Sequence, residues 1–162
     1  MTWYLNGEQN DQTIICALQK GAESLMRITL KLHRQSIRIT RKNLRRLFFI
    51  EKVGLWAHKT IFKNEYGVAI GKSSHNIWHS NSGTIQYNDH KFHYNVAEEA
   101  GQLIVKLSDH HHNPLQDIVL HIEGLVPAPD AKFTDTFNSI ILSCCWLLEE
   151  EMEQQVRLKQ AI

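Results

Sequence analysis

Arginine and lysine are concentrated in residues 27–46, a stretch without a single acidic residue. Most of its cations are arginines, whose planar guanidinium group can bind two oxygens of one phosphate. If the stretch folds into two adjacent strands, part of the set would line one exposed face and create a positive field. We therefore take it as the candidate anion-binding site, for a phospholipid headgroup or a nucleic-acid backbone. Its residues are Arg27, Lys31, Arg34, Arg38, Arg41, Lys42, Arg45 and Arg46.

Strand alternation narrows this set. Arg27 and Lys31 fall on one face of the first strand, and Arg38 and Lys42 fall on one face of the second. We expect these four to converge if the two strands pair. Two structural roles are the alternatives to ligand binding. The cations could keep a solvated sheet edge from aggregating, or they could pair with acidic residues elsewhere.

Charge is unevenly divided along the chain, although the net charge is only +1. Residues 1–72 hold 13 Lys and Arg against 5 Asp and Glu, whereas residues 73–162 hold 5 against 12. An anion-binding face and two complementary halves of one fold produce the same asymmetry.

Ten histidines raise the question of a metal site, because imidazole is the commonest metal ligand. They include His75 and His79, His90 and His93, and the run 110–112. No His-Glu-x-x-His motif, paired cysteine or regularly spaced carboxylate accompanies them, so we predict no metal site and no other cofactor. Residues 109–114 are better interpreted as an exposed turn.

Motifs of nucleophilic and nucleotide chemistry are also missing. There is no Gly-x-Ser-x-Gly elbow, and Cys144 and Cys145 fall in an apolar run where buried thiols are inert. Residues 67–73 end in Gly-Lys-Ser, but their two glycines are four apart instead of the five that a phosphate loop needs. We predict a binding module without catalytic activity.

Nucleic acid is a weaker alternative than a phosphate or headgroup ligand. Trp3, Trp56, Trp78 and Trp146 could stack on bases, but none is interleaved with the basic stretch. A structural or protein-interaction domain without a small ligand is the remaining alternative.

Short segments rich in β-branched and aromatic residues, separated by turn-forming residues, extend over residues 12–126. This pattern predicts an antiparallel sheet or barrel of about ten to twelve strands. Turns are expected near residues 33–35, 64–67, 81–83, 88–90 and 112–114. We interpret residues 1–11 as a flexible segment ahead of the barrel, within a single domain of residues 1–162.

One helix is predicted over residues 134–158, capped by Thr134 or Asp135. Its first half, Phe137 to Leu148, is apolar on every side, which requires burial on every side. It is too short for a membrane span. From Glu149 the residues turn acidic, as expected of a solvated helix end. The chain is therefore predicted to be mostly β with a C-terminal α-helix, as an antiparallel closed barrel around a buried hydrophobic helix.

This order of elements resembles the tubby C-terminal-like superfamily, which includes the phospholipid scramblases and the LURP-one-related proteins. The similar segments are residues 48–52 leading into 59–72, which match that family's paired strands with a glycine-containing turn, and Phe137 to Leu148, which looks like its central helix. The resemblance implies a barrel wrapped around the C-terminal helix. It identifies no ligand-binding residue.

Three cysteines without metal-site or redox spacing suggest reduced thiols. The first residues show neither a positive region nor an apolar region of a signal peptide. A cytoplasmic location is therefore expected.

Overall fold

The computed structural model describes the backbone of residues 2–53, 59–76, 79–125 and 131–162, and their side chains except 75–76, 79–80 and 131–133. The first strands are β1 (Thr2–Asn10), β2 (Thr13–Lys20), β3 (Glu23–Lys31), β4 (Ser36–Arg41), β5 (Leu44–Val53) and β6 (Lys59–Lys63). They are followed by β7 (Ala69–Asn76), β8 (His79–Tyr87), β9 (His90–Glu99), β10 (Gln102–Ser108) and β11 (Pro114–Glu123). A 3₁₀ turn, η1 (Leu32–Arg34), joins β3 to β4, and the helix α1 spans Ala131–Gln160.

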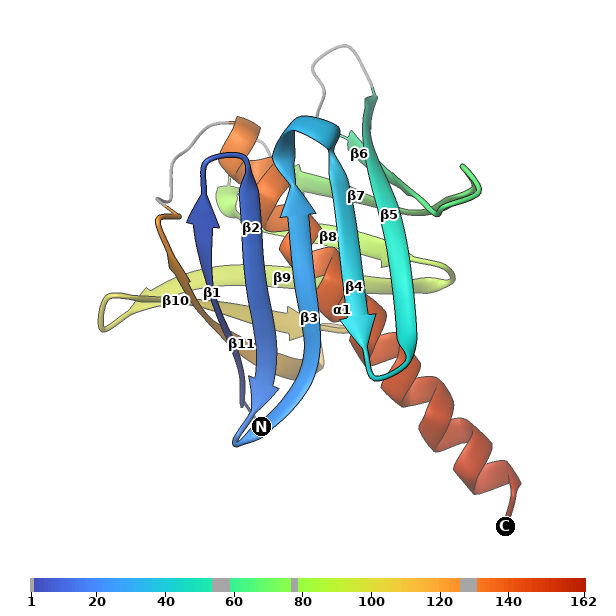
Figure 1. Cartoon of the computed structure of the whole chain (residues 1–162). Helices are drawn as coiled ribbons and strands as arrows, with labels where there is room; N and C mark the ends of the chain where they lie inside the picture. The colour runs from blue at the N-terminus through green and yellow to red at the C-terminus, as the bar shows by residue number, and fades with distance from the viewer. Residues whose placement is uncertain (1, 54–58, 77–78, 126–130) are drawn as a thin grey trace.

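The eleven strands form a closed barrel, in which each strand pairs with the next along the chain (Figure 1). This confirms the predicted closed barrel with one C-terminal helix. Neighbouring strands are antiparallel except at the closure, where β1 pairs with β11 in parallel. The exception follows from the odd strand number. When direction reverses at every step, the first and the eleventh strands run the same way.

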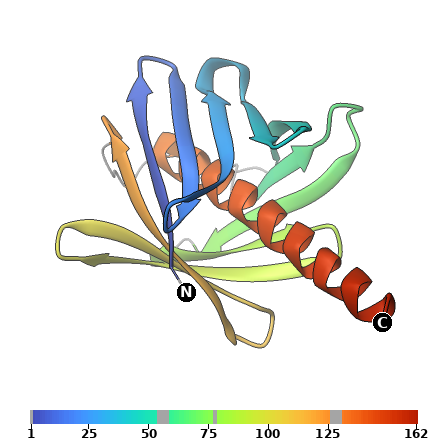
Figure 2. The same cartoon turned by 60° about the horizontal axis from the view of Figure 1, so that its bottom comes forward.

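The first half of α1 lies against the interior faces of the strands, and the second half projects beyond one end of the barrel (Figure 2). Every residue from Thr136 to Glu149 is buried. Trp146 packs in one continuous core with side chains from β1 to β11, among them Ile28 and Phe62. Barrels wider than about eight strands cannot fill their interior with their own side chains. The apolar helix fills this one.

Polar groups of the enclosed helix find partners inside the barrel. Ser143 Oγ donates a hydrogen bond to the carbonyl of Ser139 at 2.9 Å, and Asn138 Oδ1 accepts one from the Tyr94 hydroxyl at 2.9 Å. Near the helix start, Lys52 of β5 forms an ion pair of 2.5 Å with Asp135. These contacts satisfy polar groups of the helix, and the contacts with Tyr94 and Lys52 tie it to β9 and β5.

Most expected turns are present. Gly67 has φ +77°, and Asn64 Oδ1 accepts hydrogen bonds from the backbone N–H groups of Tyr66 and Val68. The turn predicted at residues 81–83 is wrong, because these residues lie within β8. Gly83 is needed there for close approach, since a Cβ atom would collide with the Tyr94 hydroxyl on β9.

The interpretation of residues 1–11 as a flexible segment is also wrong, because Thr2–Asn10 form β1 and close the barrel. Trp3 and Leu5 point into the core, whereas the alternate residues Tyr4, Asn6, Glu8 and Asn10 face outward and are exposed. The helix begins at Ala131 and ends at Gln160, beyond the predicted 134–158 on both sides. Residues 127–130, expected to separate barrel and helix, lie outside the described residues.

Replacing Trp146 with alanine should lower the free energy of unfolding by about 3–5 kcal/mol, because it opens a large cavity between helix and barrel. Leu158→Ala is the control, since Leu158 is exposed on the projecting half of the same helix and should change stability by less than about 0.5 kcal/mol. Urea denaturation measures both values. A loss below about 1 kcal/mol for Trp146→Ala would contradict the filled barrel.

Candidate functional site

Four of the eight predicted cations lie on the outer wall of the barrel. They alternate with buried residues along β3, β4 and β5, and we call them the outer basic face: Arg27, Lys31, Arg38 and Arg45. Thr40 lies opposite both Arg27 and Arg45, and Arg38 is two residues from Thr40 on the same face of β4. Diagonal neighbours of this kind have side chains about 7–8 Å apart at their bases. The three guanidinium groups therefore share one small area of the wall.

The other four cations are separated from this face. Lys42 is exposed in the β4–β5 turn with φ +52°, and Arg34 is exposed in η1 at the other end of β4. Arg41 and Arg46 are each two residues from a buried interior residue of β4 or β5, so they lie on the inner face of their strands. Both are near the end of the barrel. Of the four cations expected to converge, only Lys42 lies outside the outer basic face. Strand β4 ends at Arg41, so Lys42 belongs to the turn and not to the strand as predicted.

Within the described part of the chain, none of the eight cations forms an ion pair with a carboxylate. Phe49 shares the outer face of β5 with Arg45, and 40% of its surface is exposed between Ser36 and Lys63 on the neighbouring strands. A charged and partly apolar surface results.

Three further lysines meet at a groove that sequence analysis missed. Lys59, Lys72 and Lys91 come from β6, β7 and β9 and line a groove of about 230 Å³ together with Ser74, Thr84 and Gln86. The lysines are far apart in the sequence and are brought together by strand pairing, as in the row from Lys72 through Gln86 to Lys91. Local charge density along the chain gives no sign of such a site.

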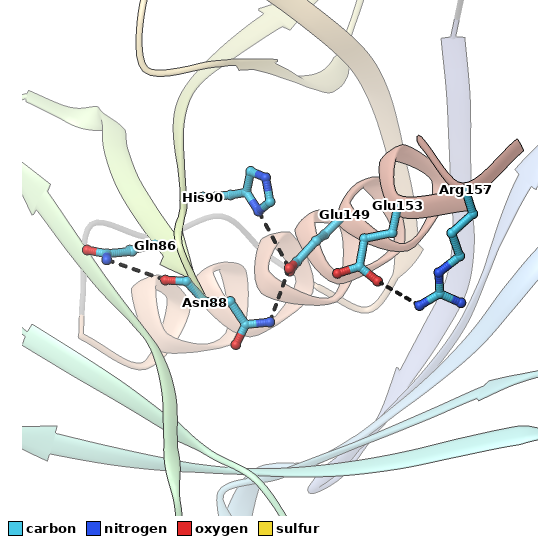
Figure 3. A network of polar contacts seen from close by, with 6 residues as sticks. All are labelled: Gln86, Asn88, His90, Glu149, Glu153 and Arg157. Atoms are coloured by element: carbon cyan, nitrogen blue, oxygen red, sulfur yellow. Dashed lines mark hydrogen bonds and ion pairs between the residues drawn. The ribbon is translucent and has the colours of Figure 1, made fainter. Parts of the chain in front are cut away.

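A second groove, of about 590 Å³, lies where α1 leaves the barrel, and we call it the mouth groove. Ile61, Ala69 and Ile70 contribute apolar surface, whereas Asn88, His90 and Glu149 contribute polar groups. Figure 3 shows the Glu149 carboxylate pointing to the β8–β9 turn. Its Oε1 accepts a hydrogen bond of 3.1 Å from Asn88 Nδ2 and lies 3.5 Å from Nδ1 of His90.

Glu149 is buried, although the acidic residues that follow the apolar run predict a solvated helix end; only 4% of its surface is exposed. The apolar run ends at Leu148, but the β8–β9 turn also covers the next residue of the helix, Glu149. Its Oε2 is buried and has no hydrogen-bond partner among the described residues. Burial raises the pKa of Glu149, and Glu153 raises it further, whereas the hydrogen bond from Asn88 and the nearby His90 oppose the shift.

The same barrel end holds a buried phenol and a guanidinium group. Burial and the charge of Glu149 raise the pKa of Tyr87 to about 12, and Arg46 acts against this shift. Arg46 lies 5.8 Å from the centre of the Phe48 ring, and its Nε has no partner among the described residues. Arg46 therefore shares this barrel end with Glu149, but it forms no ion pair with a described carboxylate, so the alternative that the cations pair with acidic residues gains no support here.

Other candidate groups have positions that limit their chemistry. Trp3 and Trp146 are buried and cannot stack on bases, and Trp56 and Trp78 lie outside the described residues. His110 and His111 are exposed in the β10–β11 turn, as expected. Among the side chains that the structure describes, no three His, Cys, Asp or Glu residues gather closely enough to hold a metal ion.

Comparisons with protein-family models, with curated proteins and with solved structures gave no match. No helix in the described part of the chain is long and apolar enough to cross a bilayer.

The three cysteines should be unreactive in the folded protein. All are buried as free thiols, and burial raises the pKa of Cys16 to about 12 and also raises the pKa values of Cys144 and Cys145. Because the thiolate is the reactive form, a disulfide reagent should label none of them in native buffer and all of them in guanidinium chloride. Rapid labelling under native conditions would show that the helix core is accessible.

Glu149→Gln should change how stability depends on pH. Because the pKa of Glu149 is raised in the folded state, that state holds a proton more tightly than the unfolded chain. Wild-type stability should therefore fall relative to Glu149→Gln as pH rises from about 4 through the raised pKa, and then stay level. Urea denaturation between about pH 4 and 8 measures the difference. A difference that is constant over this range, or that favours wild type as pH rises, would contradict the raised pKa.

Proposed function

We propose that this chain is a binding module without catalytic activity that recognises phosphate-bearing ligands, phospholipid headgroups in particular, through the outer basic face. The observation that carries the proposal is the joint position of Arg27, Arg38 and Arg45. They occupy neighbouring outward sites on three paired strands, and none of them forms an ion pair with a described carboxylate. Arginines held in this way attract phosphate groups and bind them with two parallel hydrogen bonds each.

Apolar groups beside this face favour a lipid surface over a nucleic acid. Phe49 is exposed on the same wall, and the β6–β7 turn, which directly follows Lys63, exposes 83% of Tyr66 and 57% of Val68. Side chains of this kind can enter the boundary between headgroups and acyl chains, whereas the cations bind the headgroup phosphates. The tryptophans that could have stacked on bases are buried or lie outside the described residues.

Kinship with the tubby C-terminal-like superfamily is part of the proposal. It is supported by the closed barrel around a C-terminal helix, which is an analogy of fold and does not itself assign a ligand. The free, buried thiols of Cys16, Cys144 and Cys145 fit a reducing compartment, and we propose the cytoplasm.

Replacing Arg27 and Arg38 with serine should weaken binding to vesicles containing phosphatidylserine by roughly 10- to 30-fold. Each basic side chain near an anionic membrane contributes about 1 kcal/mol, and both residues are exposed, so folding should be unaffected. Vesicle co-sedimentation at low salt measures the partition coefficient. Its dependence on salt should also become shallower in the variant.

The matched control is Lys72→Ser with Lys91→Ser, which removes the same charge from a different part of the wall. Equal losses in the two double variants would mean that net charge, not the outer basic face, drives binding. A single-stranded oligonucleotide of random sequence is the second ligand to test. Tighter binding to it than to the vesicles, or no binding of wild type to either at low salt, would overturn the proposal.

A further inference from the structure

We infer that the mouth groove is a binding site for a small organic cation, an alkylamine whose ammonium group is held by Glu149 and whose carbon chain lies against Ile61 and Ile70. This site has the opposite charge preference to the outer basic face and does not depend on it. The two proposals can therefore fail separately.

The carboxyl group of Glu149 is only half satisfied. Asn88 and His90 both approach Oε1, so they leave Oε2 without a donor among the described residues (Figure 3). A buried acceptor without a donor is destabilising, and more so if it is charged. A ligand N–H group entering from the groove that Glu149 lines would supply the missing hydrogen bond.

The groove has the size of a ligand site. Its volume of about 590 Å³ lies within the range of small-molecule pockets, and its lining combines apolar residues with several polar and charged ones. Strands β6 and β7 contribute the apolar residues of the lining, and the β8–β9 turn and α1 contribute most of its polar groups. Gly71 keeps β7 close to β8, since a Cβ atom there would lie 2.5 Å from the carbonyl oxygen of Gln86.

Charges around the groove favour a cation. The carboxylates that line it are Glu149, Glu153 and Asp89, and the basic groups are Lys72 and His90. Glu153 is partly neutralised by Arg157, at 3.6 Å, which leaves Glu149 as the enclosed charge. Further titratable groups at this barrel end are Tyr87, Arg46, Glu150 and the buried thiol of Cys145, whose pKa is raised in part by Glu149.

Binding should release a proton. Because the pKa of Glu149 is raised, its neutral form persists to higher pH than in the unfolded chain, whereas an ammonium group is bound best by the carboxylate. The proton leaves Glu149 for solvent as the cation arrives. Affinity for an amine that is fully protonated across the range should therefore rise with pH until Glu149 is ionised, and then stay level.

Titration with n-butylammonium chloride tests the inference, with the side-chain amide signals of Asn88 followed by NMR. We expect the Asn88 signals to shift saturably with n-butylammonium. The affinity for n-butanol, which lacks the charge, should be at least fivefold lower. Tetramethylammonium, which lacks an N–H donor, should also bind at least fivefold more weakly. Sodium chloride at equal ionic strength is the blank.

Glu149→Gln should reduce n-butylammonium affinity at least tenfold. Glu153→Gln is the matched variant, because it removes the same charge from the same groove but from a side chain that is half exposed and paired with Arg157. It should change affinity less than threefold. If the Glu149→Gln variant does not fold, the pH dependence of n-butylammonium binding to the wild-type protein is the test instead. Equal effects of the two substitutions, equal affinity for n-butanol, or affinity independent of pH would each overturn the site.

Discussion

The constraint on which the rest of the structure depends is the width of the barrel. Eleven strands enclose more space than their own inward side chains can fill, and an unfilled interior would forfeit the dispersion contacts that stabilise a core. A helix that is apolar on all sides is one way to fill that space. The hydroxyl groups of Ser139 and Ser143 are tolerated inside because both donate to backbone carbonyls within the helix.

Much of the fold follows from local patterns that only one structure can satisfy. The all-round apolar run from Phe137 to Leu148 requires a surrounding wall, and the short alternating segments before it can supply that wall only as a sheet. Glycine is ambiguous, because Gly67 permits a turn whereas Gly83 permits close approach of Tyr94. The first strand was missed because its outward side chains are polar and only Trp3 and Leu5 mark its interior face.

The sites were harder to predict than the fold, for a physical reason. Local charge density identified the cations of β3 to β5. Which of them lie on the outer wall, in a turn or on the interior face depends on where each strand begins and ends. The lysine groove and the mouth groove combine residues from several strands, so they depend on pairing registers that one sequence does not reveal. Glu149 is buried because the β8–β9 turn extends past the end of the apolar run, and only the height of the barrel determines that.

The parallel pairing of β1 with β11 has a consequence for the order of folding. Thr2 lies beside Asp117, so the wall cannot be sealed until nearly all of the strands have been synthesised, and the helix that fills the interior comes later still. On the ribosome the earlier hairpins therefore present their interior faces without a partner, as an open and curled sheet. Contacts of such large sequence separation form slowly and leave apolar surface exposed meanwhile. A nascent chain of this kind needs protection from aggregation until α1 emerges.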